Sequence, residues 1–313
     1  MRRCHPALTH GVTVGALVAR FFNSCYREPT VHIPDGFLAT PVWAVLDAAA
    51  APAVVLIARR AQRGFDQAQA PLLGVMGAFV FAAQMINFPV GAGTTGHLVG
   101  GALLAMTLGP ASASVVMTAI LAIQALVFQD GGVLALGANA VNMALVGVLA
   151  GYLPFSLWGG TPWRRFSIFA GGFLSVLVSA VLALSELLIS GVPMPRPMLG
   201  ITLGLFLVSA ILEGAITLAV LESLERIQPQ AVRRPRAGRS PALGVLAVAA
   251  VLLASVGVLI ASQAPDAIQR LTRLPAQEPA AWLSKSAAGL GGLALIYAAC
   301  LALGRVASRN RSA

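Results

Sequence analysis

The sequence predicts an all-α integral membrane protein with about nine transmembrane helices. Only 10% of its 313 residues are charged, whereas a soluble domain carries about 25%. Apolar residues make up 58% of the chain. They gather in runs of roughly 17 to 25 residues, which is the length that a helix needs to cross the hydrocarbon core of a bilayer.

Nine segments are long and apolar enough to be candidate spans. Seven of them form a body, and the last two form a C-terminal unit. The third segment is short and rich in glycine, which is typical of a broken or re-entrant helix packed inside protein. The nine segments are 42–58, 71–88, 95–109, 111–128, 133–153, 166–189, 198–221, 242–262 and 286–304.

The distribution of basic residues predicts the orientation in the membrane. Segments 59–70, 154–165, 222–241 and 305–313 contain 13 arginines, whereas the opposite loops contain three arginines and one lysine. Basic residues concentrate on the cytoplasmic side, so the N-terminus is expected outside and the C-terminus inside, as in a multi-pass protein of the bacterial inner (cytoplasmic) membrane. The same rule explains the net charge of +10, so we expect lipid and no nucleic acid as a partner.

Residues 1–30 differ from the rest of the chain. They begin Met-Arg-Arg, continue with a short apolar stretch and resemble a weak signal peptide. A second interpretation is a misassigned extension, because some bacterial genes start at a GTG codon, which otherwise encodes valine, and Val31 precedes a distinctive motif. Both interpretations give a mature chain that begins at residue 31. The third interpretation is a real N-terminal extension without a role.

Two histidines, His32 and His97, are predicted to lie on the outer side of the membrane. They are the only histidines beyond the first ten residues. Imidazole is the commonest side-chain ligand of transition metals, so one interpretation is metal capture at this face. The other is hydrogen bonding at the membrane interface, with His97 capping a helix. Both interpretations stay open on the residues alone.

A chain that begins at residue 31 would create a chelating group. The amine of residue 31, the backbone nitrogen of His32 and its Nδ1 form two fused chelate rings, and His97 supplies a fourth nitrogen. Tetragonal nitrogen sets suit Ni(II) or Cu(II). This set contains no carboxylate and no thiolate, and its affinity is expected to fall at low pH because its nitrogens must be deprotonated.

Several motifs occur in the order found in a known family. Together they resemble the CbiM/NikM family, the substrate-capture (S) components of energy-coupling-factor (ECF) transporters for cobalt and nickel. The similarity covers about residues 31–225. The motifs are HIPDGFL at 32–38, GAFVFAAQMINFP at 77–89, GHLVGG at 96–101, QDGG at 129–132 and ALGANAVNM at 135–143.

The resemblance implies a metal-capture site and partners. Members of the family begin Met-His-Ile-Pro, and their ligands correspond to Val31 (through its terminal amine), His32 and His97. The thirty preceding residues and the valine depart from that pattern. The resemblance further implies a membrane coupling (T) subunit, two cytoplasmic ABC ATPases, Ni(II) or Co(II) as cargo and no prosthetic group.

The C-terminal part of the chain resembles a smaller unit. Residues 226–241 are polar and rich in arginine, as expected of a cytoplasmic linker. Residues 242–313 resemble the two-span CbiN/NikN accessory unit, which some family members carry as a fusion. Its Pro-Asp-Gly-Leu-Glu hallmark is present only as PDAIQ at 265–269.

Further polar residues are expected to support or gate the metal site. Gln84 and Asn87 lie three apart on one helix face and bond either the loops that hold the histidines or neighbouring helices. We expect Glu186 and Glu213 to serve packing or partner contacts. The supporting set is Pro34, Asp35, Gln84, Asn87, Thr94 and Thr95.

Two other classes of function are alternatives. A membrane enzyme would need a catalytic set inside the bundle, such as paired aspartates, HExxH or serine with histidine, and the sequence contains none. An S component for an organic micronutrient would need an aromatic-lined cavity, but only 6% of residues are aromatic. No GxxxxGK[ST] loop is present, so ATP hydrolysis is assigned to separate subunits. The choice between nickel and cobalt stays open.

Overall fold

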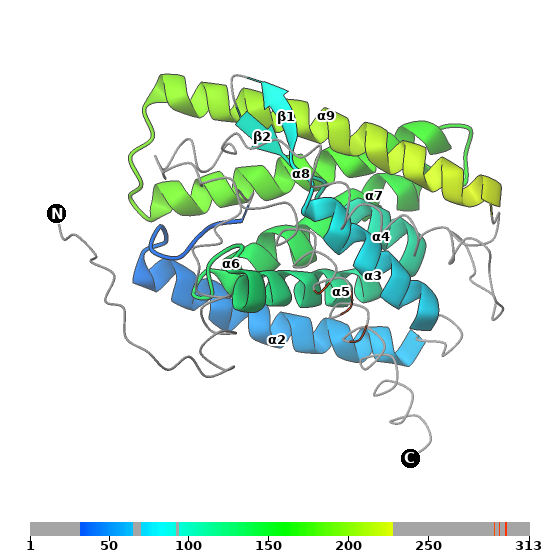
Figure 1. Ribbon diagram of the computed structural model, residues 1–313, viewed down its shortest axis with the longest axis horizontal. Helices are drawn as coiled ribbons and strands as arrows, with labels where there is room; N and C mark the ends of the chain where they lie inside the picture. Colours follow the sequence, from blue (N-terminus) through cyan, green and yellow to red (C-terminus); the bar gives the residue numbers. More distant parts are fainter. Residues whose placement is uncertain are drawn as a thin grey trace, which may run out of the picture.

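The computed structural model describes residues 32–64, 70–91 and 94–227, with isolated positions 291, 294 and 298. Its long helices run along one common direction, and a short hairpin lies beside the last of them (Figure 1). The elements are α2 (Thr40–Gly64), α3 (Ala70–Gln84), β1 (Phe88–Gly91), β2 (Thr94–Gly96), α4 (Gly101–Leu108), α5 (Pro110–Ile123), η2 (Gln124–Phe128), α6 (Leu136–Asn139), η3 (Ala140–Gly147), α7 (Val148–Trp158), α8 (Arg164–Ile189) and α9 (Arg196–Ile227), where η2 and η3 are π-helices.

Five stretches of the described chain are long and apolar enough to cross a membrane. They confirm five of the predicted spans, whereas α3 is apolar but has only 15 residues. The segments predicted at 242–262 and 286–304 fall almost entirely outside the described residues, so the count of nine is not confirmed. The five stretches are Thr40–Gly64, Pro110–Phe128, Leu136–Trp158, Arg164–Ile189 and Leu199–Ile227.

The segment 95–109, predicted as a short and broken or re-entrant helix, is not one continuous helix: its first two residues end strand β2, and its helical part is α4. The body is mostly helical but includes a two-stranded hairpin. Strands β1 and β2 form an antiparallel hairpin in which Phe88 pairs with Gly96. A turn then leads into α4, which has only eight residues. Gly100 and Gly109 flank α4 with φ of 75° and 82°. Glycine adopts this left-handed region readily, so both ends of α4 are bends that a continuous helix cannot make.

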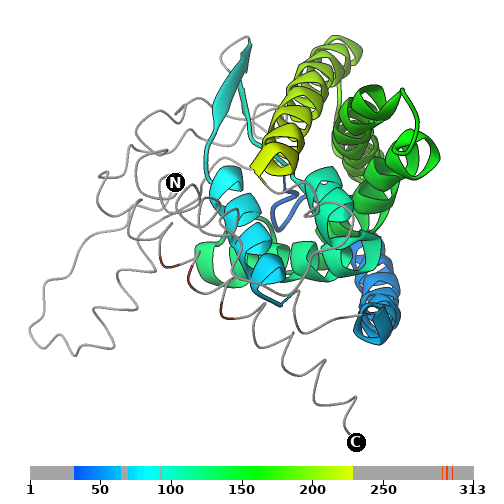
Figure 2. The same ribbon diagram turned by 90° about the vertical axis from the view of Figure 1, so that its right-hand side faces the viewer.

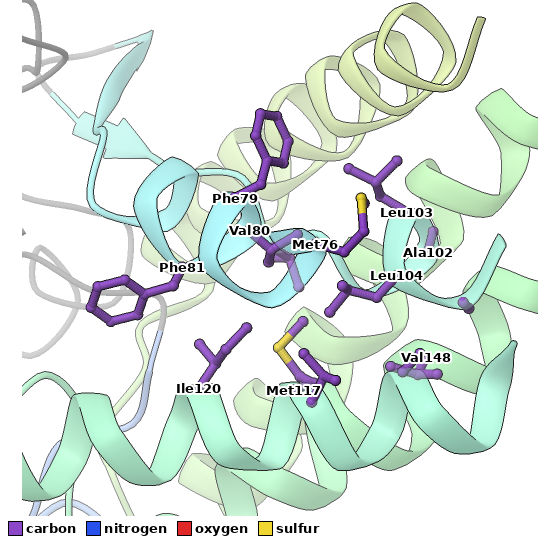
Figure 3. Close-up of a cluster of buried hydrophobic side chains, with 14 of the residues drawn as sticks. Met76, Phe79, Val80, Phe81, Ala102, Leu103, Leu104, Met117, Ile120 and Val148 are labelled. Atoms are coloured by element: carbon purple, nitrogen blue, oxygen red, sulfur yellow. The ribbon is translucent and has the colours of Figure 1, made fainter. Parts of the chain in front are cut away.

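The core of the bundle is apolar and close-packed. Side chains of α3, α4 and α5 interdigitate in it (Figure 3). Helix association in a membrane depends on such van der Waals packing rather than on exclusion of water. The fully buried members include Met76, Val80, Leu103, Leu104, Met117 and Ile120.

The two ends of the bundle differ in charge. Helix α2 begins just after His32 and carries Arg63 in its last turn, at the opposite end. Helix α8 begins with Arg164 and Arg165, which form ion pairs with glutamates near the end of α9. The histidine-bearing segments therefore lie at the end of the bundle away from these arginines.

Candidate metal centre

The segment that follows residue 31 is inserted into the bundle. His32 and Ile33 are 1% and 0% exposed, and the dark-blue start of the described chain lies within the ring of helices in the view along them (Figure 2). The backbone N–H of Ile33 donates to Asn139 Oδ1 at 2.9 Å, and the Ile33 carbonyl accepts from Asn139 Nδ2 at 3.1 Å and from Gly132 N at 2.9 Å. A buried backbone needs such partners, so these bonds fix the segment that carries His32.

Pro34 and Asp35 continue this segment towards the surface. Pro34 is half-buried and Asp35 is exposed. The carboxylate of Asp35 accepts hydrogen bonds from Val133 N at 3.0 Å and Leu134 N at 2.8 Å. Asp35 thus ties the segment to the loop before α6 and does not face the histidines.

The structure brings His32 and His97 together. Their ring centroids are 5.7 Å apart at an angle of 54°, and both side chains are buried. His97 Nδ1 lies 2.8 Å from the carbonyl oxygen of Leu98. Because a carbonyl only accepts, Nδ1 carries the hydrogen and Nε2 carries the lone pair that a metal requires.

The environment of His97 keeps it neutral. Burial, and next the proximity of His32, lower the pKa of His97 from 6.5 to about 4, although the Leu98 carbonyl and Asp130 oppose the shift. A metal ligand must be deprotonated. His97 therefore meets this requirement throughout the neutral range of pH.

A carboxylate that was not among the predicted site residues lies beside His32. Asp130 Oδ1 is 3.0 Å from His32 Nδ1, and Asp130 is buried. The chain turns sharply here, since Gln129 and Gly131 have φ of 54° and 90°. The sequence does contain a signal for Asp130. This acid follows an apolar run and lies on the same predicted side of the membrane as both histidines.

The described residues do not complete a metal site by themselves. Within them, no group of three or more His, Cys, Asp or Glu side chains is arranged to hold a metal ion. Val31, whose amine was predicted as a ligand, lies outside the described residues. A site built on His32 and His97 therefore needs a donor of another kind, such as a backbone or terminal nitrogen.

Gln84 binds the loop that follows His97. Its Nε2 donates to the carbonyl of Val99 at 2.7 Å, and its Oε1 accepts from Gln124 Nε2 at 2.8 Å. Asn87 and Thr95 are buried near the hairpin. Thr94 belongs to β2, and only its backbone is described.

The two membrane glutamates have different surroundings. Glu213 of α9 accepts hydrogen bonds from the backbone N–H groups of Val99 and Gly100. Glu186 of α8 accepts a hydrogen bond from the side chain of Asn142 at 2.8 Å. Sequence reasoning did not identify the link between Glu213 and the loop of His97, because 114 positions separate Glu213 from Val99.

Comparison with known proteins identifies the family. Residues 32–231 match the CbiM family, described as "Cobalt uptake substrate-specific transmembrane region". This chain belongs to the CbiM family. The resemblance of its motifs is thereby confirmed, and the chain is a multi-pass membrane component of a cobalt and nickel transport family.

Relatives of this CbiM family member include archaeal proteins. A putative metal transport protein of Haloquadratum walsbyi is 37% identical over 204 residues, which cover 64% of this chain and 93% of that protein. A putative fused nickel transport protein NikMN of Archaeoglobus fulgidus is 33% identical over 222 residues, which cover 69% of this chain and 73% of that protein.

A solved structure has the same fold. The crystal structure of a truncated transition metal transporter is 36% identical and superposes with a TM-score of 0.55 over 63% of this chain and 99% of that one. The residues matched to the CbiM family include His32, His97 and Asp130, and stop before the predicted two-span unit at 242–313.

Proposed function

We propose that this CbiM family member is the substrate-binding S component of an ECF-type importer for Ni(II) or Co(II). One observation carries the proposal: two buried histidines 65 positions apart meet at one end of the bundle with ring centroids 5.7 Å apart. The protein captures the metal at the outer face of the bacterial inner membrane. A membrane T subunit and two cytoplasmic ABC ATPases energise its release inside.

The proposed ligands are nitrogens. They are the amine of residue 31 in a chain that starts there, the backbone nitrogen and Nδ1 of His32, and Nε2 of His97. A tetragonal four-nitrogen set of this kind suits Ni(II) or Cu(II). Metal binding at His32 Nδ1 replaces the contact with Asp130, and the carboxylate then lies close enough to offset part of the cation's charge.

Calorimetry on the purified mature protein tests the histidines. Titration with Ni(II) and Co(II) is expected to show binding to the wild-type protein and none to His32→Ala or His97→Ala. Ser156→Ala lies at the opposite end of the bundle and serves as the control that binds normally. Unchanged affinity in either histidine variant contradicts the ligand assignment.

The amine ligand has a separate test. Mass spectrometry of the purified protein is expected to show a mature chain that begins at residue 31. A chain expressed from codon 31 with an initiating methionine is then expected to bind as tightly as the mature protein. Wild-type affinity in a chain that retains Met1 contradicts the role of the amine and leaves both histidines as ligands.

A further inference from the structure

We infer that Glu213 of α9 is a positioning residue that sets the place of His97 in the metal site. The inference rests on the proposed function and adds to it a group that touches no metal. Glu213 is 1% exposed, near the middle of a helix that spans the bundle. A carboxylate at that depth is costly unless it is hydrogen-bonded or paired.

Glu213 bonds the backbone two and three positions beyond His97. Oε2 accepts from the N–H of Val99 at 2.8 Å, and Oε1 accepts from the N–H of Gly100 at 2.7 Å. Each oxygen therefore takes one hydrogen, so the two bonds fix both the position and the tilt of this part of the backbone.

The start of α4 explains why a carboxylate is needed there. The first N–H groups of a helix lack partners within it, and Gly100, which precedes α4, has no side chain to cap them. Glu213 satisfies one of these groups, the N–H of Gly100, from another helix, and it also bonds the N–H of Val99 directly before it.

The loop is held from the opposite side as well. Gln84 of α3 donates to the carbonyl of Val99 at 2.7 Å. The Val99 backbone is thus fixed between α3 and α9, with its N–H bonded to one helix and its carbonyl bonded to the other. The ring of His97 is bonded to the carbonyl of Leu98 at 2.8 Å, so its orientation depends directly on this fixed backbone.

Helix α9 contacts the chain on both sides of His97. One turn before Glu213, Ser209 lies against Gly96, where an added Cβ would be only 2.9 Å from Ser209 Oγ. Two residues one turn apart on α9 therefore contact the chain on either side of His97. Ser209 lies against Gly96, and Glu213 bonds the backbone of Val99 and Gly100. A change at Glu213 is expected to move His97, although it removes no ligand.

The substitution Glu213→Gln tests the inference because an amide has one acceptor where two are needed. Its NH2 group would face a backbone N–H. Groups that orient metal ligands typically contribute about 10- to 100-fold to affinity, so the Kd for Ni(II) is expected to rise by about that factor. The spectroscopic test is electron paramagnetic resonance of the Cu(II)-loaded mature protein, whose nitrogen hyperfine pattern in Glu213→Gln is expected to differ from that of the wild type.

Thr217→Val is the matched control. Thr217 is fully buried on the same helix, one turn beyond Glu213, and its hydroxyl has no hydrogen-bond partner within the described residues. Valine has nearly the same shape, so this variant is expected to keep the wild-type Kd and the wild-type Cu(II) spectrum. Thermal unfolding and gel filtration of every variant separate misfolding from repositioning.

The outcomes distinguish the inference from the proposed function. If the wild-type protein binds Ni(II) and Glu213→Gln matches it in Kd and spectrum, the inference is overturned and the proposed function stands. A folded Glu213→Gln that is less stable but keeps the wild-type Cu(II) spectrum also overturns it, because the role is then only structural.

If Glu213→Gln does not fold, Gln84→Met provides a second test. This variant removes the opposite bond to Val99 and is expected to give the same spectral shift. A wild-type spectrum in that variant overturns the inference. A wild-type protein that binds neither Ni(II) nor Co(II) overturns both.

Discussion

Asn139 holds the backbone of Ile33 in both directions, donating to its carbonyl and accepting from its N–H, although 106 positions separate the two residues. The pair imitates the bonding between neighbouring strands. It places a segment without secondary structure of its own inside a membrane bundle. His32 is the residue directly before this anchor, so its position depends on Asn139.

Asn139→Ala is expected to weaken both folding and metal binding. A buried polar group that loses its partner costs about 1–3 kcal/mol, so the free energy of unfolding should fall by about 2 kcal/mol and Ni(II) affinity should fall with it. Thermal unfolding in detergent and calorimetry measure the two effects. Ser185→Ala, near the same end of the bundle, is expected to change stability by less than about 0.5 kcal/mol; an equally mild Asn139 variant would show that the anchor is dispensable.

Asp130→Asn is expected to weaken Ni(II) binding by about 10- to 100-fold, the usual effect of losing a group that contacts a metal ligand. The reason is its contact with His32 Nδ1 at 3.0 Å and the loss of a negative charge near the cation. Glu222→Gln is the control, since it also removes a carboxylate but Glu222 pairs with Arg165 at the opposite end of the bundle. Equal Kd values for the two variants would contradict a role for Asp130.

Gly131→Ala is expected to disturb the site by sterics alone. Gly131 has φ of 90°, and an added Cβ would lie 3.0 Å from the Cβ of His32. The left-handed conformation costs an alanine about 1–2 kcal/mol, and the contact displaces the imidazole. Gly160→Ala has open space and an ordinary φ, so it should match the wild type in unfolding temperature and Ni(II) affinity. The prediction fails if the two alanine variants behave alike.

The stability of the metal-free protein is expected to decrease as the pH falls from about 6.5 towards 4. The pKa of His97 is about 4 in the folded protein and near 6.5 when unfolded. Between these values the unfolded chain takes up a proton that the folded chain excludes, so acid favours unfolding. Above about 6.5 the contribution is fully present.

The unfolding temperature measured against pH, after removal of metal with a chelator, tests this expectation. His97→Asn lacks the titrating ring and serves as the reference, so the wild-type curve should drop more steeply over this interval. Parallel curves for the two proteins would show that His97 does not titrate in this way.

The spans and the shared side of the two histidines could be predicted from the sequence. A span depends on a local run of apolar residues, and the orientation of the chain depends on a count of basic residues. A run of apolar residues is sufficient for a membrane helix, as five described stretches confirm. The arginine count placed His32 and His97 on one side without any knowledge of packing. The structure places both in contact at one end of the bundle.

Features that depend on distant partners could not be predicted. The hairpin of β1 and β2 lies in a segment whose glycines also suit a broken helix. Asp130 and Glu213 carry no local sign that they face His32 and the backbone beyond His97, since each contact joins residues about a hundred positions apart. Periodicity and charge report the environment of a residue, and they do not report its partner.

The anchoring of Ile33 by Asn139 also has a consequence for biogenesis. Contacts between positions so far apart close a long loop, and such contacts form late in folding because loop closure costs entropy. The imidazole of His32 reaches its place only after the chain beyond position 130 has been made and packed. A newly inserted, incompletely folded chain thus lacks the complete four-nitrogen site, which is assembled only when folding has brought His32 and His97 together.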